Sequence, residues 1–117
     1  MASLYDEALA ASPLTPVVLP RGSAGNFSKY VAYLPAGVDR AALKRVLREE
    51  YGVALSGEVY ELPLHRQPVF EPWADDEPLP GAEEICARHV CLPVSAVLRD
   101  DQVAAVVGAL AGALDRV

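Results

Sequence analysis

The side chains with the clearest chemical potential lie together in EVYELPLHRQPVF, residues 58–70. Histidine serves as an acid, a base or a binding residue because its ordinary pKa lies near neutral pH. Here His65 precedes Arg66 and Gln67, whose N–H groups suit an anionic or hydroxylated ligand. Prolines on either side of the histidine stiffen the segment. The residues alone therefore leave two interpretations open, a binding site and a stiff loop.

The second histidine and both cysteines lie in CARHVC, residues 86–91. A structural zinc site needs four ligands, usually in two clusters, and this stretch does not provide the fourth. We therefore expect no metal, and we interpret Cys86 and Cys91 as buried thiols whose spacing along a helix does not suit a disulfide. His89 falls on the apolar side of that helix, so we expect a buried imidazole with hydrogen-bonded nitrogens.

Other catalytic and nucleotide-binding patterns are absent from the sequence. No serine lies in the G-x-S-x-G context of a nucleophile elbow. The chain contains neither G-x-G-x-x-G nor the P-loop pattern, and RGSAGNFSK lacks the P-loop spacing. Taken alone, the residues describe a binding or interaction domain without visible catalytic equipment.

The elements that must position His65 follow from periodicity and from turn residues. The pattern predicts helices over residues 3–11, 39–51 and 82–91, a final helix capped by Asp100 or Asp101, and strands over 27–35 and 53–60. Asp39 suits the N-cap of the second helix, and Gly52 its end. Five prolines make residues 61–81 a long stiff connection. This order predicts an α+β fold, with a small antiparallel sheet of about three strands covered by helices.

Length and composition limit the classes of function. The 117 residues suit a single domain. A formal charge of −6 with dispersed basic residues argues against nucleic acid as a partner. No apolar run approaches the roughly 20 residues that span a bilayer, and the first residues lack the basic start of a signal peptide. We expect a cytoplasmic protein without membrane contact, and the 52% apolar content suggests a face that another surface covers.

Five segments in one order resemble the carboxyl-terminal third of the DegT/StrS family of aminotransferases. They are YVAYLP (30–35), GVDRAALKRVLREEYGV (37–53), VYELPLHRQPVF (59–70), LPGAEEICARHVCLPVS (79–95) and LRDDQVAAVVGAL (98–110). SLYDEAL also resembles the helix that joins the two domains of these enzymes. The resemblance implies one domain over 1–117, in which 1–12 end the interdomain helix and 13–117 form the small domain of the aspartate-aminotransferase fold (fold type I).

The family's enzymes use pyridoxal phosphate (PLP) to aminate nucleotide sugars and aminocyclitols. Their large domain carries the lysine that forms the Schiff base and the other groups that hold PLP. Lys29 and Lys44 match neither the position nor the surroundings of that lysine. The resemblance thus implies PLP in the complete enzyme, no catalytic or cofactor-binding residue on this chain, and no activity alone. The implied partners are the missing large domain, a second copy in a homodimer, and a sugar or cyclitol substrate.

The resemblance also assigns a role to the opening segment. In the family, the loop similar to VYELPLHRQPVF approaches the active site, and its histidine contacts substrate. That role maps to His65, with Tyr60 and Gln67 as further substrate-binding candidates. Many members have a His-Tyr pair where this chain has Val59 and Tyr60, and a proline in place of Glu61, so their substrates do not transfer to it.

Two other interpretations remain open. The chain could be a free-standing, non-catalytic module derived from the same fold that binds a protein or a sugar. It could also be a generic α+β interaction domain whose likeness to the family is accidental.

Overall fold

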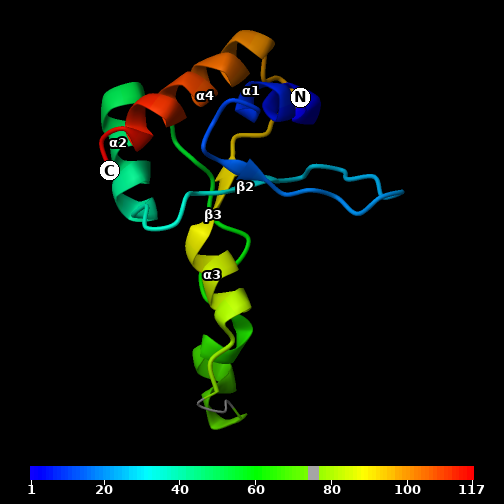
Figure 1. Cartoon of the computed structure of the whole chain (residues 1–117), viewed down its shortest axis with the longest axis vertical. Helices are drawn as coiled ribbons and strands as arrows, with labels where there is room; N and C mark the ends of the chain where they lie inside the picture. The colour runs from blue at the N-terminus through cyan, green and yellow to red at the C-terminus, as the bar shows by residue number, and fades with distance from the viewer. Residues whose placement is uncertain (74–76) are drawn as a thin grey trace.

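A three-stranded antiparallel sheet lies at the centre of the fold. The structure, a computed structural model, describes residues 1–73 and 77–117. The strands lie in the order β1 (Thr15–Pro16), β2 (Tyr30–Tyr33) and β3 (His89–Leu92). β2 pairs along its length with β3, and Figure 1 shows these two strands side by side. The predicted α+β architecture with a small antiparallel sheet is confirmed.

Three helices surround one end of this sheet. They are α1 (Ala2–Leu9), α2 (Arg40–Tyr51) and α4 (Asp100–Leu114), and α4 packs against both of the others. Their apolar faces meet the sheet in one core. Its buried members are Tyr5, Leu9, Leu14, Tyr30, Ala32, Leu34, Leu43, Leu47, Leu55, Val90, Leu92, Val103, Val106, Ala109, Leu110 and Ala113. Residues of α1 thus share the core with the rest of the chain.

The ends of α2 follow from local chemistry. The Asp39 carboxylate accepts the backbone N–H groups of Ala41 and Ala42 at 2.8 and 3.0 Å, as an N-cap does. Gly52 ends the helix with φ of 65°, a left-handed conformation that favours glycine. Both predictions for this helix are confirmed. The prediction for α4 is wrong in one detail, because Asp100 and Asp101 lie in its first turn and Arg99 is the N-cap residue.

The third strand is not the one predicted. Residues 53–60 form no strand, and only Ser56 makes an isolated bridge, to Cys91. The strand is instead β3; the helix predicted over residues 82–91 includes its first three residues but in fact ends at Arg88. All four residues of β3 are buried. A short run that is buried on both faces shows no alternation, so periodicity does not separate it from a helix.

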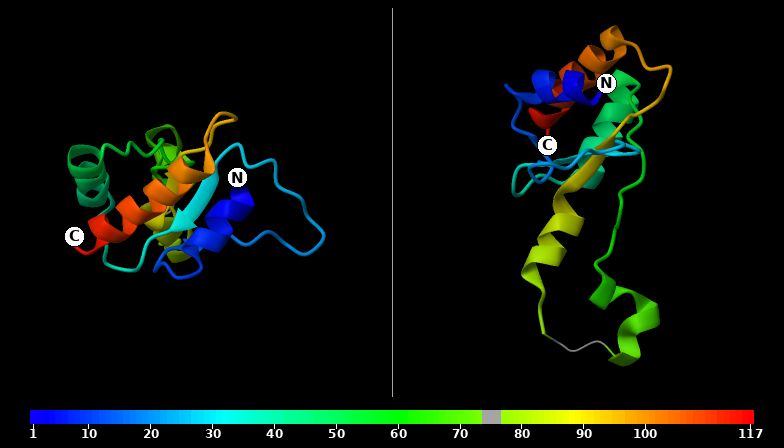
Figure 2. Two further views of the ribbon diagram at one scale, coloured as in Figure 1. Left: turned by 90° about the horizontal axis from the view of Figure 1, so that it is seen from above. Right: turned by 90° about the vertical axis from the view of Figure 1, so that its right-hand side faces the viewer.

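The three-stranded sheet and helices α1, α2 and α4 are here called the body. An arm, made of residues 60–73 and 77–88, extends from it (Figures 1 and 2). The arm contains two 3₁₀ turns, η1 (Leu64–Arg66) and η2 (Pro68–Trp73), and helix α3 (Pro80–Arg88). The two turns and the start of α3 lie within the predicted connection 61–81, of which 74–76 are outside the described residues. The radius of gyration is 15.5 Å, above the roughly 13 Å of a compact domain this long. The arm accounts for the elongation.

Large apolar side chains are exposed along the arm. They are Tyr60, Leu62, Leu64, Val69, Phe70, Trp73, Leu79 and Ile85. Such a concentration of exposed apolar surface is typical of an interface rather than of a free monomer surface. Within the described part of the chain, no helix combines the length and the apolar character that crossing a bilayer requires.

Candidate functional site

His65 lies in the first 3₁₀ turn of the arm, and a carboxylate from α3 faces it. Its Nε2 atom is 3.0 Å from Oε1 of Glu83. Arg66 donates to the same oxygen from Nε at 3.3 Å and from Nη2 at 3.1 Å. The His65 side chain is 13% exposed. The proline-rich turn and α3 thus hold the histidine between them while leaving part of its ring accessible.

Glu83 is the residue of this cluster that the sequence did not single out as a site residue. The hydrogen bond from His65, and then those from Arg66, hold the pKa of the Glu83 carboxyl below its ordinary value. The carboxylate is therefore an acceptor at neutral pH. Eighteen residues separate it from His65, and no local spacing rule links two such positions. The sequence predicted only that Glu83 lies in the first turn of a helix.

Tyr60 and Gln67 lie beside a different hollow from His65. Both line an apolar recess of about 560 Å³, together with Leu62, Val69 and Ile85 among others. The Gln67 side chain donates to the Leu62 carbonyl at 3.0 Å, and Tyr60 is 68% exposed.

His65 lines a second recess of about 400 Å³, with Phe70, Trp73 and Leu79. Leu64, Phe70 and Ala82 border both recesses, which are therefore neighbours. The structure brings the three predicted residues onto one arm without joining them in a single pocket.

His89 and the two cysteines are buried, as predicted. The His89 ring bonds at both nitrogens: Nε2 accepts the N–H of Val59 at 2.9 Å, and Nδ1 lies 2.8 Å from the Ile85 carbonyl. Cys86 and Cys91 are free thiols. Burial raises the pKa of the Cys91 thiol, which disfavours the reactive thiolate. These three residues are structural parts of the arm's base.

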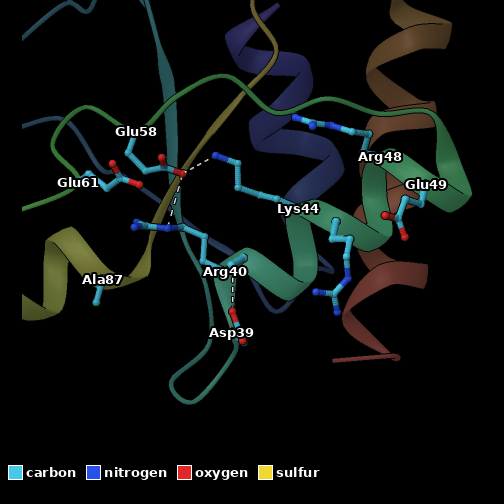
Figure 3. A pocket seen from close by; sticks show the side chains of 10 residues that line it. Asp39, Arg40, Lys44, Arg48, Glu49, Glu58, Glu61 and Ala87 are labelled. Carbon is cyan, nitrogen blue, oxygen red and sulfur yellow. Dashed lines mark hydrogen bonds and ion pairs between the residues drawn. The ribbon is translucent and has the colours of Figure 1, made fainter.

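The root of the arm is held by ion pairs on α2 (Figure 3). The Glu58 carboxylate, whose side chain is 7% exposed, lies 2.8 Å from Lys44 Nζ and 3.5 Å from Arg40 Nε. Arg40 also donates to the carbonyls of Cys86 and His89, at 2.6 and 3.1 Å, near the end of α3. Burial raises the pKa of Glu58, but the bond from Lys44 and the neighbouring positive charges outweigh it and lower the pKa.

These pairs border a recess of about 710 Å³. Its lining includes four basic side chains, of Arg40, Lys44, Arg45 and Arg48, and four acidic ones, of Asp39, Glu49, Glu58 and Glu61. The opposite charges balance, so the recess does not favour an anion over a cation. We interpret it as the outer side of the ion pairs of Glu58 with Arg40 and Lys44. These pairs, here called the anchor, hold the arm.

The side-chain amines of the two lysines of the chain both contact acceptor groups within the chain. Lys29 Nζ donates to the carbonyls of Gly57 and Glu58 at 2.7 and 3.3 Å. Lys44 Nζ pairs with the Glu58 carboxylate. A Schiff-base lysine needs a free amine next to the cofactor, whereas both amines here are bonded within the chain. Residues 1–73 and 77–117 also contain no group of three or more His, Cys, Asp or Glu side chains arranged for a metal.

The sequence and the fold were compared with known proteins. A family model described as the DegT/DnrJ/EryC1/StrS aminotransferase family matches residues 1–111. The aminotransferase TlmJ from Streptoalloteichus hindustanus matches with a TM-score of 0.79 and 28% identity, over 98% of this chain and 30% of that one. A DegT DnrJ EryC1 StrS aminotransferase from Brucella abortus matches with a TM-score of 0.78 and 25% identity, over 97% and 29%. A search of curated proteins found no match.

The chain thus spans about three tenths of the length of the two solved relatives. Both are aminotransferases by their description, and they share nearly all of this fold. Since the family model covers almost the whole sequence, the suspected resemblance is confirmed. This chain belongs to the DegT/DnrJ/EryC1/StrS aminotransferase family.

Proposed function

We propose that this chain is the carboxyl-terminal small domain of a PLP-dependent aminotransferase that acts on a nucleotide sugar or an aminocyclitol. The observation that carries the proposal is the match over 98% of this chain and only 30% of a solved aminotransferase. In the proposal, PLP and its lysine belong to a large domain that supplies the remaining length. The bonded state of Lys29 and Lys44 supports this division, because neither amine is free.

The arm supplies a surface for the missing parts. Its exposed apolar side chains, Trp73 at 77% among them, would be covered when the large domain and a second copy of the enzyme pack against it. This covering agrees with the high apolar content of the sequence. We propose that the complete enzyme is a homodimer in the cytoplasm, and that this chain does not transaminate alone.

Within that enzyme, His65 is the proposed substrate contact, with Tyr60 and Gln67 as secondary contacts. The ring of His65 lines a recess bordered by aromatic and aliphatic side chains. Ligand sites combine such apolar walls with a few placed polar groups. We propose that the large domain closes the open side of this recess over a sugar or cyclitol.

The first test is a titration of this chain with PLP, followed by absorbance. We expect no Schiff-base band, and a band lost specifically in Lys29→Arg or Lys44→Arg would overturn the proposed inactivity. The second test joins the chain to the polypeptide encoded upstream of it and measures amino transfer to nucleotide-sugar and cyclitol ketones. Glu50→Gln, in the last turn of α2, is the control for His65→Ala and Gln67→Ala.

The two proposed variants should raise KM while the control leaves it unchanged. If no cofactor-binding polypeptide is encoded upstream, and the chain alone binds a sugar or a protein, the non-catalytic module is the better description. That result would remove the enzyme assignment for this chain while leaving its family membership intact.

A further inference from the structure

The contact between His65 and Glu83 restricts the chemistry that the histidine offers. An ionised carboxylate only accepts hydrogen bonds, so the nitrogen that faces it must carry a proton. Glu83 Oε1 lies 3.0 Å from Nε2 of His65. The bonds from His65 and Arg66 lower the pKa of Glu83, which keeps it ionised. In the neutral ring, the proton therefore resides on Nε2 and the lone pair on Nδ1.

Among residues 1–73 and 77–117, the other ring nitrogen, Nδ1 of His65, has no hydrogen-bond partner. In the same part of the chain, no side-chain nitrogen or oxygen is both fully buried and unpaired. With respect to the described part of the chain, Nδ1 is therefore accessible, on a side chain that lines the recess beside Phe70 and Trp73.

We propose that Glu83 is a positioning residue that holds His65 in the Nε2–H form, so that Nδ1 accepts a hydrogen bond from a hydroxyl or ammonium group of the substrate. The substrate part of this inference rests on the proposed function, whereas the positioning part concerns this chain alone. An acceptor at Nδ1 selects donor groups and disfavours a phosphate or carboxylate oxygen, which needs a donor. His65 in its neutral form thus binds a hydroxylated or aminated part of the ligand.

Arg66 supports the same arrangement. Its guanidinium donates twice to the oxygen that His65 contacts, so Glu83 is bound from two directions. Two donors on one carboxylate restrict its rotation, and a restricted carboxylate fixes the ring plane of its partner. The pair of donors explains how a half-buried glutamate near the start of α3 can orient a histidine in the separate turn η1.

The chain contains its own reference for the test. His89 carries its proton on the opposite nitrogen, because Nε2 accepts the Val59 N–H and Nδ1 bonds to the Ile85 carbonyl. Nitrogen-15 NMR of the two imidazoles at about pH 8.5, well above the ordinary histidine pKa of about 6.5, should show one ring of each tautomer. Two rings of the same tautomer, or a mixture at His65 in the unaltered chain, would overturn the proposal.

A matched pair of variants isolates the glutamate. Glu83→Ala should convert His65 to a mixture of tautomers and leave the His89 signals unchanged. Glu84→Ala removes the neighbouring carboxylate of the same helix, which pairs with Arg88, and should change neither ring. Because the substitution and the helix are the same, a general effect on α3 would appear in both variants. A fixed Nε2–H form that survives in Glu83→Ala contradicts the assignment.

Kinetics of the joined enzyme then test the substrate part. Glu83→Ala should raise KM about three- to tenfold, the size of one lost hydrogen bond, with a smaller change in kcat. In a His65→Ala background the same substitution should have no further effect on KM, since the positioned ring is gone. If NMR shows the expected tautomer but His65→Ala leaves KM unchanged, the proposed substrate contact is wrong and the positioning stands. If Glu83→Ala and His65→Ala raise KM additively, the proposal that Glu83 acts through His65 is wrong.

Discussion

Nε2 of His89 accepts the backbone N–H of Val59 at 2.9 Å, across thirty residues of sequence. His89 is the first residue of β3, and Val59 immediately precedes the arm, so this bond ties the root of the arm to the sheet. The other ring nitrogen bonds to the Ile85 carbonyl in α3. One buried imidazole thus joins the strand, the helix and the incoming chain.

Replacing His89 with alanine should loosen the arm before it unfolds the body. The variant leaves a cavity and an unpaired Val59 N–H, which we expect to cost about 2–4 kcal/mol in the free energy of unfolding. Amide hydrogen exchange measures the local effect. Val59 should lose more protection than Val53, whose N–H donates to the Leu47 carbonyl at the end of α2. Equal losses at both amides would mean that His89 stabilises the fold only globally.

Glu58 should make the stability of the protein depend on acid pH. Its folded pKa is lowered, so its contribution is complete above the unfolded value of about 4.3 and is lost as the pH falls through the folded pKa. Glu58→Gln should reduce the free energy of unfolding at pH 7 by about 1–3 kcal/mol, because Arg40 and Lys44 lose their partner. Denaturant unfolding between about pH 6 and pH 3 should also give a flatter profile for this variant.

Glu61→Gln is the control for that experiment. Glu61 borders the same recess, but it is in none of the ion pairs recorded for the described residues. Its variant should follow the unaltered protein from neutral to acid pH. The proposed anchor is refuted if Glu58→Gln and Glu61→Gln have the same stability at pH 7.

Replacement by alanine should change the free energy of unfolding differently at two glycines of α4. A Cβ at Gly108 would meet no atom within 4 Å, so Gly108→Ala should stabilise the helix by about 0.5–1 kcal/mol. At Gly112, a Cβ would lie 2.9 Å from Cζ of Tyr51, so the ring must move away from α4. Gly112→Ala should therefore gain nothing or lose stability in denaturant unfolding. A similar gain at both sites would show that the Tyr51 contact contributes little.

The hydroxyl of Tyr5 should stabilise the packing of α1 against the rest of the body. The group donates to the Pro93 carbonyl at 2.8 Å, and burial raises its pKa to about 12. Tyr5→Phe should cost about 1 kcal/mol at neutral pH. Because the folded pKa is raised from 10.0, stability should fall as pH rises between these values, and less steeply in the variant. An unchanged free energy of unfolding at neutral pH would count against this bond.

The sequence was most informative where structure depends on neighbouring residues. Asp39 and Gly52 mark the ends of α2 because capping involves groups within one turn. Period-two alternation holds in residues 30–34, where Tyr30, Ala32 and Leu34 share the buried face. It failed for His89–Leu92, where burial on both faces removes the alternation, and for 53–60, whose apolar residues do not pair as a strand.

By itself, then, the sequence determined the family resemblance, the α+β class and the ends of α2, and it made His65 the candidate for substrate contact. The tertiary structure decided which segment forms the third strand, and it placed Glu83 against His65 and Val59 against His89. The physical reason is the range of the interactions. Caps and periodicity act over a few residues, whereas the arm and its root bring together groups eighteen and thirty positions apart, and such pairs exist only after the chain has folded.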